Sequence, residues 1–491
     1  MQNKGTAGSE QAKEAKFLRM TTQPVERLIL KLALPTIISM LVTSFYNLAD
    51  TFFIRQLNSD SMGAAVGVVL PLMNIIQAIG FYHGHGSGNY ISRAFGRRDL
   101  GDAEKMAATG FYLAFFFGIL LAVVGLSLRR SFAQILGAKT EETIENSIRY
   151  MQYILLAAPL MMGSIVMNNQ LRFQGNAFFS MLGLTSGAIM NLILDPILIF
   201  SAGQSIGVFG LRASFGAGMG VAGAALATAL SQGLSFTVLA IGLSRSDNIK
   251  IRIRNFCPTP EYLRKIMQGG LPSLARQGIA SIATASLNHS VGMYLAGTGL
   301  IDAAQAAMTG VNRIMMLLAS VLIGFGQGFQ PVCGFNYGAG YYHRVRQAFR
   351  FCLKVAFVVL IVLAVLGFVF AAPVTNLIAG TSAEAAEIAV FAFRAQLVTI
   401  PLHAWIVLCN MMLQNIGATA KATILAISRQ GIAFIPVILL LPMLLQLFGA
   451  PPLLGIETAQ PVADVISFLI AIPIGLSELR KMDGKEKGEK A

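Results

Sequence analysis

Charged residues are scarce in this chain of 491 residues. Asp, Glu, Lys and Arg make up 12% of it, about half the share usual in soluble proteins, while hydrophobic types make up 55%. Only four cysteines occur, and none has C-x-x-C spacing, which excludes a disulfide scaffold. The hydrophobicity excludes a disordered chain. A mean hydropathy of +0.65 instead favours a helical membrane protein.

The chain also lacks the short motifs of common enzyme classes. Neither an H-E-x-x-H metalloprotease signature nor a Walker A phosphate loop occurs in it. The run His83-Gly-His85-Gly-Ser-Gly88 misses the G-x-S-x-G pattern, because His85 occupies the first glycine position. Residues 1–27 hold no apolar core of a signal peptide, so the first apolar segment should be a retained membrane helix. We therefore expect neither an enzyme nor a bound cofactor.

Apolar runs near 20 residues recur along the whole chain. A helix rises about 1.5 Å per residue, so such a run crosses the ~30 Å hydrocarbon core of a bilayer. The runs lie near 30–54, 63–87, 107–128, 149–171, 179–200, 218–243, 266–296, 303–330, 352–372, 388–413, 422–447 and 457–477. They are too long, and alternate too little, for barrel strands. The pattern predicts an all-α polytopic membrane protein with twelve transmembrane helices.

Lys and Arg are concentrated in alternate loops. Residues 93–105, 245–265, 344–350 and the C-terminal tail are rich in them, whereas the loops near 300, 380 and 450 have almost none. By the positive-inside rule the rich loops and both termini are cytoplasmic, which predicts a multi-pass protein of the cytoplasmic (inner) cell membrane. The formal charge of +14 then reflects topology and lipid head groups, and we expect no nucleic-acid partner.

The two halves of the chain resemble each other. Leu34-Pro35 corresponds to Leu271-Pro272, and Gly86-Ser-Gly88 corresponds to Gly326-Gln-Gly328. Two six-helix bundles with pseudo-two-fold symmetry around a central cavity are typical of transporters. The expected parts are a cytoplasmic tail 1–27, an N-lobe 28–245, a cytoplasmic linker 246–265, a C-lobe 266–478 and a cytoplasmic tail 479–491.

Two acidic residues interrupt the apolar runs of the first half. An ionisable group at bilayer depth costs about 2.5–3.5 kcal/mol, so each acid is a functional candidate. Asp50 ends the segment Tyr46-Asn47-Leu-Ala-Asp50, and Asp195 follows Asn191 by one helical turn. Two carboxylates with amide oxygens suit a proton relay or a hard cation such as Na⁺. The alternative is that each acid is a helix-end residue paired with a neighbouring Arg.

The second half has no counterpart of these acids. At the offset between the halves, Asp50 falls on Leu287 and Asp195 on Val437, which predicts an ion site in the N-lobe only. The second half instead repeats one segment, as Arg276-Gln277-Gly-Ile-Ala and as Arg429-Gln430-Gly-Ile-Ala. These residues either line the cavity and set its charge, or pack helices together at a Gln and Gly seam.

Segments from both halves together resemble the multidrug and toxic compound extrusion (MATE) family. In the first half these segments are 35–50, 168–176, 191–196 and 220–228. In the second half, segments 271–278, 324–331 and 428–431 resemble its DinF-like branch. The similarity extends over nearly the whole chain.

The resemblance implies a two-lobed antiporter that exports organic, often cationic, compounds by alternating access in exchange for H⁺ or Na⁺. The positions that match its ion-coupling site, and would hold Na⁺, are Asp50, Asn191, Asp195 and Thr228. Asn168 or Asn169 matches a further asparagine of the fourth helix. The candidates for the substrate cavity are Tyr46, Asn47, Arg276, Gln277, Arg429 and Gln430. The acids that another branch carries in its C-lobe are absent.

Other functions remain open on the sequence. A lipid-linked precursor flippase of the same superfamily would need a large basic cavity, whereas this N-lobe offers acids. A non-transporting membrane scaffold or receptor would show no ion-dependent flux. We expect a monomer with small organic substrates and membrane lipids as its partners. The loop 201–218 is longer than is common in the family.

Overall fold

The structure is a computed structural model that describes residues 2–57, 59–204, 216–245, 249–378 and 382–488. In these ranges the chain is helical apart from its turns and one isolated β-bridge between Ser201 and Ala217. Internal contacts divide the chain into two units. Residues 1–22 and 38–270 form the first, called the N-lobe below, and residues 23–37 and 271–491 form the second, called the C-lobe.

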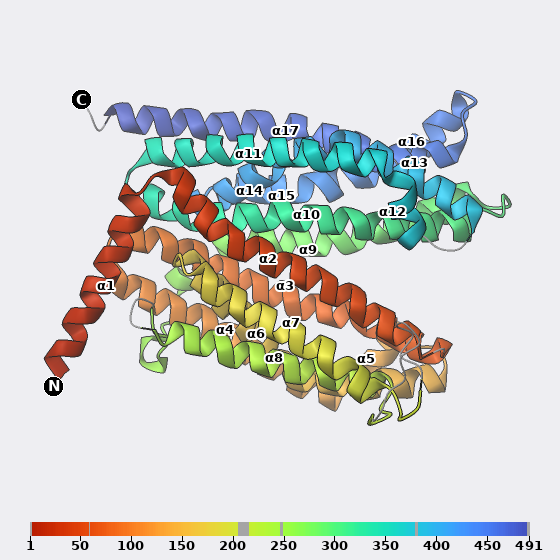
Figure 1. The fold of residues 1–491 in the computed structure, drawn as a ribbon, viewed down its shortest axis with the longest axis horizontal. Coiled ribbons are helices and arrows are strands. Elements are labelled where there is room, and N and C mark those ends of the chain that lie inside the picture. Colours follow the sequence, from red (N-terminus) through yellow and green to blue (C-terminus); the bar gives the residue numbers. More distant parts are fainter. Residues whose placement is uncertain (1, 58, 205–215, 246–248, 379–381, 489–491) are drawn as a thin grey trace. The chain divides into compact units, whose positions relative to one another are not determined.

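The N-lobe is a helical bundle whose members begin at side-chain caps. Ser59, Asp99, Thr140 and Asn176 each accept a hydrogen bond from a first-turn backbone N–H, which satisfies a donor that the helix itself leaves free. The caps start α3, α4, α6 and α7. The helices are α1 (Gln2–Thr22), the later part of α2 (Val25–Arg55), α3 (Asp60–Gly96), α4 (Leu100–Ser127), α5 (Arg129–Ile135), α6 (Glu141–Phe173), α7 (Ala177–Ile199) and α8 (Val221–Leu243) (Figure 1).

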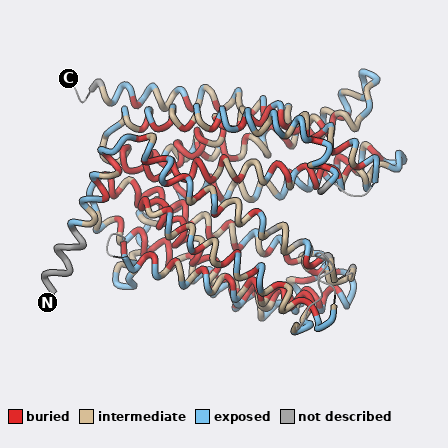
Figure 2. Tube along the Cα trace, in the orientation of Figure 1, coloured by how far each residue is buried: buried red, intermediate tan, exposed pale blue. Residues whose placement is uncertain are grey.

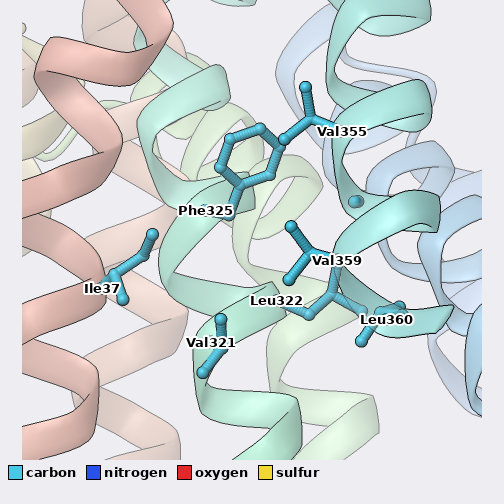
Figure 3. Close-up of a pocket in the computed structure, with 8 residues that line it drawn as sticks. Ile37, Val321, Leu322, Phe325, Val355, Val359 and Leu360 are labelled. Atoms are coloured by element: carbon cyan, nitrogen blue, oxygen red, sulfur yellow. The ribbon is translucent and has the colours of Figure 1, made fainter. Parts of the chain in front are cut away.

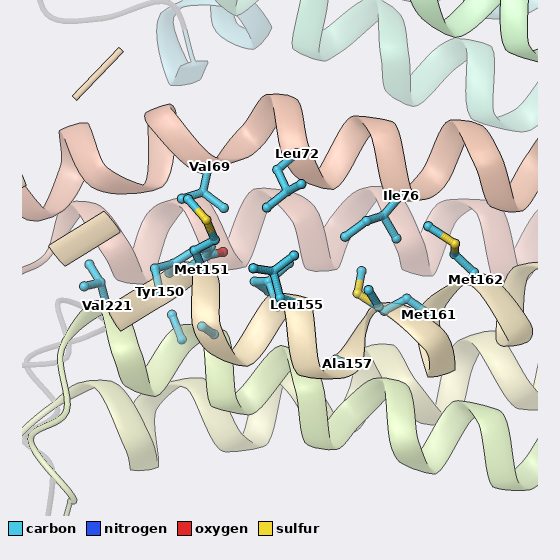
Figure 4. Packing of buried hydrophobic residues seen from close by; sticks show 14 of the residues in the cluster. Val69, Leu72, Ile76, Tyr150, Met151, Leu155, Ala157, Met161, Met162 and Val221 are labelled. Atoms are coloured by element: carbon cyan, nitrogen blue, oxygen red, sulfur yellow. The ribbon is translucent and has the colours of Figure 1, made fainter. Parts of the chain in front are cut away.

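The apolar core of the N-lobe includes facing residues of α3 and α6. Val69, Leu72 and Ile76 recur at helical spacing on α3 and face α6, where Met151 and Leu155 are fully buried (Figure 4). Buried residues alternate with exposed and intermediate ones along the coils of the helices (Figure 2). Many exposed side chains are large and apolar, as a lipid-facing surface requires.

The C-lobe contains two spans whose α-helix is interrupted. One span changes to the 3₁₀ helix η2 at Pro401, which lacks a backbone N–H for the α pattern. The other contains the π-helix η3 (Ser428–Ala433). The remaining elements of the second half are η1 (Ile253–Asn255), α9 (Pro260–Tyr294), α10 (Ile301–Gly338), α11 (Tyr342–Val369), α12 (Ala371–Ile378), α13 (Ala383–Thr399), η2 (Ile400–Leu402), α14 (His403–Ile416), α15 (Thr419–Ile427), α16 (Phe434–Leu447) and α17 (Pro452–Gly488).

The predicted fold class is confirmed. Among the described residues, eleven helices are long and apolar enough to cross a membrane, with α13–α14 and α15–α16 each counted as one. The twelfth span of the fold is α9, which has the length but carries Arg276, Gln277, Asn288 and His289 along its course. The helices extend beyond the predicted apolar runs, because their polar end turns remain helical: α6 begins at Glu141 rather than near 149.

The two units differ from the expected lobe boundaries at two places. The linker after residue 248 and the start of α9 pack on the N-lobe, where Tyr262 donates to Asp102 over 2.7 Å and Gly269 approaches Gly86. The start of α2 packs on the C-lobe, where the Thr36 hydroxyl donates to the Gly324 carbonyl over 2.6 Å. Apolar spacing does not reveal which bundle a helix joins, so the sequence boundaries followed the loops instead. Most of the long loop 201–218, residues 205–215, lies outside the described residues.

Candidate functional site

The helix pair α7–α8 holds the predicted polar residues together. Gly183, Gly187, Asn191 and Asp195 follow one another at intervals of four, so they lie along one face of α7. This face packs on α8: a Cβ on Gly187 would lie 3.1 Å from the Ser231 carbonyl oxygen. The two glycines bring the backbones close together, and the next two turns of the same face place Asn191 and Asp195 in the resulting interface.

Asn191 joins Asp195 to α8. Its amide nitrogen donates to Asp195 Oδ1 over 3.3 Å and approaches the Thr228 hydroxyl at 3.5 Å. All three residues are buried, and Asp195 has no exposed surface. The structure thus brings together three of the predicted ion-site residues, from two helices.

Asp50 reaches the same group from α2. Asp50 and Asp195 lie within electrostatic range of each other, and Tyr46 lies within range of both. Tyr150 of α6 also lies within range of both acids. Neither carboxylate forms an ion pair with a described side chain, and the side chain of Arg55, five residues after Asp50, lies outside the described residues. The side chain of Asn47 lies outside the described residues.

The group contains several buried oxygens without a hydrogen-bond partner. They are Asp50 Oδ1, Asp195 Oδ2, Asn191 Oδ1 and the Ser231 hydroxyl oxygen. A buried polar atom left unpaired costs about 1–3 kcal/mol, so their grouping needs an explanation. Oxygen donors of this kind suit a hard cation such as Na⁺, and the carboxylates alone suit protons. We define these residues together with Thr228 as the N-lobe acidic group.

Asn168 and Asn169 lie apart from the N-lobe acidic group. Asn168 is 18 residues beyond Tyr150, which is about 27 Å along α6. Its amide nitrogen donates to the backbone oxygen and the hydroxyl of Ser180, joining α6 to α7. Asn169 accepts a hydrogen bond from the buried Arg172 over 2.7 Å. The structure gives both asparagines packing partners and does not bring them to the two acids.

The C-lobe contains a polar network of another kind, in which the buried carboxylate is paired with an arginine. Asp464 of α17 is fully buried, and its carboxylate accepts from Arg429 Nε at 2.7 Å and from Gln460 at 2.9 Å. His403 Nε2 lies 2.9 Å from its other oxygen, which also accepts from Thr399 at 3.2 Å. Arg429 and Asp464 thus form a buried ion pair between η3 and α17.

Arg276, by contrast, forms no ion pair or hydrogen bond with any residue that the structure describes. Gln277 and Gln430 likewise form no hydrogen bond there. An apolar pocket elsewhere in the C-lobe, lined by residues such as Ile37, Phe325 and Val359, holds only about 60 Å³ (Figure 3). That volume is well below the ~300 Å³ of a typical ligand site, so this pocket is not the candidate.

The sequence analysis missed two residues near the N-lobe acids, Ser231 and Tyr150. Ser231 had a usable signal, because it follows Thr228 by three residues and so shares its helix face. Tyr150 had none, since α6 meets the acids only through tertiary packing. The four-partner environment of Asp464 also depends on packing, because its partners come from α13, α14 and η3 as well as α17.

A sequence model of one family, described as MatE, matches residues 35–197 and again 279–440, which together are more than half of the chain. The chain belongs to the MatE family. The double match also confirms the internal repeat, because one unit of the family covers each half.

Named relatives agree with this membership. The chain is 26% identical over 438 residues to the multidrug export protein MepA of Staphylococcus aureus (strain MSSA476), covering 89% of this chain and 92% of the relative. It is 25% identical to MepA of Staphylococcus haemolyticus (strain JCSC1435), covering 94% and 95%. A solved multidrug resistance MATE family transporter in an outward-facing conformation superposes with a TM-score of 0.83, at 26% identity and 95% and 98% coverage. This MatE protein is therefore a multi-pass membrane transporter and not an enzyme.

Proposed function

We propose that the protein is a secondary active multidrug efflux antiporter, which exports organic, mostly cationic, compounds in exchange for H⁺ or Na⁺. The observation that carries this proposal is the N-lobe acidic group, in which two carboxylates share a buried site without a cation partner among the described residues. The similarity to proteins named for multidrug export supports the direction and breadth of transport.

Coupling follows from the charge of the site. Asp50 and Asp195 together place up to two negative charges at bilayer depth, and a proton or Na⁺ lowers that charge. A bound ion stabilises the conformation in which the carboxylates are satisfied, so ion binding shifts the population of states. Release of the organic compound is coupled to this shift when the compound prefers the ion-free state. Asn191, Thr228 and Ser231 supply the neutral oxygens that would complete a Na⁺ shell.

The proposed orientation follows from the loop charges. Both termini and the Lys- and Arg-rich loops face the cytoplasm, so the α2–α3 turn and the end of α7 face outward. The N-lobe acidic group then lies toward the outer side, because Asp50 and Asp195 come late in helices that run outward. The protein acts as a monomer in the cytoplasmic membrane.

Uptake into everted vesicles tests the proposal, because their outer face is the cytoplasmic face of the membrane. A fluorescent organic cation is added outside, and its accumulation inside is driven separately by a pH gradient and by a Na⁺ gradient. We expect one of the two gradients to drive transport, and Asp50→Asn or Asp195→Asn to abolish it while the protein still inserts in the membrane. Asp302→Asn, which changes an exposed acid of α10, is the matched control and should transport normally.

Two outcomes would contradict the proposal. Full ion-driven transport by both acid variants would remove the site assignment. A wild-type protein that produces no ion-dependent flux under either gradient would remove the antiport function itself.

A further inference from the structure

A chain of polar side chains joins the start of α3 to the first turns of α6. The Ser61 hydroxyl donates to Glu142 Oε1 over 2.6 Å and accepts from the amide nitrogen of Asn146 at 3.3 Å. Glu142 and Asn146 are four residues apart, so they lie on one face of α6. Glu142 is exposed, whereas Asn146 is buried. The chain therefore leads from the surface of the N-lobe into its interior.

The same face of α6 continues to the N-lobe acidic group. Tyr150 follows Asn146 by one more turn, is 1% exposed and lies within electrostatic range of both acids of the group. Ser147, which comes one turn before Tyr150, has a buried hydroxyl without a hydrogen-bond partner. Tyr150 is eight residues from Glu142, or about 12 Å along the helix. Polar side chains thus cover the distance from the surface to the two acids.

The negative charge of Glu142 is not neutralised by the protein that the structure describes. Glu142 forms no ion pair with a described side chain, and its hydrogen bond comes from the neutral Ser61. Its neighbour Glu141 differs, because it pairs with Arg130 over 2.8 Å. An exposed carboxylate without a basic partner raises the local concentration of cations, and salt screens this attraction. Glu142 therefore places a cation-attracting charge at the exposed end of the chain.

Packing of α3 on α6 accounts for only part of this arrangement. The Ser61 hydroxyl holds the two helices together, but the amide oxygen of Asn146 accepts no hydrogen bond from a described residue. The Ser147 hydroxyl oxygen has no partner either. Buried oxygens without a partner are costly, so they need an explanation beyond packing. Carboxylate, amide and hydroxyl oxygens are the ligands that hard cations prefer.

We propose that Glu142, Ser61, Asn146, Ser147 and Tyr150 form an entry path through which the coupling cation reaches the N-lobe acidic group. In the proposed orientation α6 begins on the outer side, so the cation enters from outside the cell. Glu142 attracts it, and the oxygens that follow replace part of its water shell. The inference rests on the proposed antiport function and adds the residues that admit the ion.

Thiol labelling tests the path without any transport. Asn146→Cys is made together with Cys257→Ser, which removes the native cysteine that is not buried. Purified protein in phosphatidylcholine nanodiscs reacts with a methanethiosulfonate that carries an ammonium group or one that carries a sulfonate. Each rate is divided by the rate of that reagent with free cysteine. We expect the ammonium reagent to be preferred, and Glu142→Gln to lower this preference about fivefold in ~0.15 M salt. No reaction with either reagent, or a preference that does not depend on Glu142, would overturn the path.

Two further variants control the labelling. Glu145→Gln removes another exposed acid of α6, which has no hydrogen bond or ion pair with a described residue, and it should change the preference much less than Glu142→Gln. Equal effects of the two variants would assign the preference to general surface charge and contradict the path. Ser147→Cys replaces only the hydroxyl oxygen by sulfur, and it repeats the measurement if Asn146→Cys does not fold.

The ion dependence of uptake tests the path in the working transporter. The coupling ion is loaded inside everted vesicles, where the outer face of the protein lies. Glu142→Gln should raise the half-saturating ion concentration about threefold at low ionic strength and less in ~0.5 M KCl, because salt screens the lost charge. Asn146→Leu should slow uptake at every ionic strength, whereas Asn146→Ser keeps an oxygen and should slow it less. An unchanged ion dependence in Glu142→Gln would overturn the role of this acid.

The outcomes separate the path from the efflux function. Ammonium-selective labelling that depends on Glu142, in a protein without ion-driven uptake, would leave the path standing and contradict the efflux function alone. Ion-driven uptake that requires Asp50 and Asp195 but neither Glu142 nor Asn146 would contradict the path alone.

Discussion

Arg429 of η3 donates its Nε–H to Asp464 of α17 over 2.7 Å, and the acid has no exposed surface. The bond therefore ties the π-helix to the last span of the C-lobe. Each partner is a charge that the bilayer interior would otherwise penalise, so the effect of removing one differs from that of removing both.

Removing one partner of this pair should destabilise the C-lobe strongly. Asp464→Leu leaves Arg429 without its carboxylate, and we expect a loss of about 3–5 kcal/mol. The double variant Arg429→Leu with Asp464→Leu should recover most of that loss, because no charge is left unpaired. Thermal unfolding of the detergent-purified variants measures both. If the double variant were as unstable as the single one, the loss would come from packing and not from an unpaired charge.

Asn191→Ala should separate the two candidate coupling ions. The change removes a neutral amide oxygen but keeps both carboxylates. With Na⁺ as the coupling ion, the Na⁺ concentration that half-saturates efflux should rise about tenfold, because a direct ligand is lost. With H⁺ as the ion, efflux under a pH gradient should persist. Thr237→Ala, a change in an exposed hydroxyl of α8, is the control and should alter neither response.

Gly223→Ala should weaken the α7–α8 pair near the N-lobe acidic group. The added Cβ would lie 2.5 Å from the carbonyl carbon of Leu198, which is backbone and cannot rotate away. We expect about 1–3 kcal/mol of destabilisation from overpacking and a loss of transport. Gly233→Ala, on the same helix with open space around its Cβ, should be tolerated. Equal melting temperatures for the two variants would contradict the close approach of these helices.

Tyr262→Phe should loosen the linker from the N-lobe. Burial raises the pKa of the Tyr262 phenol and its hydrogen bond to Asp102 raises it further, so the phenol remains a donor at neutral and mildly alkaline pH. Loss of the hydroxyl leaves Asn255–Glu104 and Cys257–Thr109 to hold this segment. We expect trypsin to cut faster at Arg252 and Arg254 in the variant, with little change at Arg130. Unchanged cleavage would show that the other contacts suffice.

The sequence predicted the fold because the length and apolarity of a segment are enough to identify it as a membrane span. It also placed Asn191 and Asp195 one turn apart on one helix face, and the structure shows a hydrogen bond between them. Whether these residues couple ions remains a prediction.

Contacts between helices that are distant in the chain could not be predicted from the sequence. Tyr150 joins the acids only because α6 packs beside them, and nothing in its neighbourhood distinguishes it. Asn168 and Asn169 show the converse. The resemblance to the family made them candidates for the ion site, whereas in the structure Asn168 joins two helices and Asn169 binds Arg172. The boundaries of the lobes also depend on where α2 and α9 pack, which no local pattern encodes.

The π-helix in the C-lobe changes which residues of the two halves occupy equivalent positions on their helices. Its N-lobe counterpart on α7 is regular α-helix, so η3 contributes an extra residue within a turn and rotates all that follows by about 100°. Val437 is the counterpart of Asp195 in the chain, yet it no longer occupies the counterpart's azimuth. A carboxylate introduced there by Val437→Asp would face away from the equivalent position. The extra residue moves that azimuth to the next position, so Ile438→Asp, and not Val437→Asp, would place a carboxylate at the equivalent of Asp195.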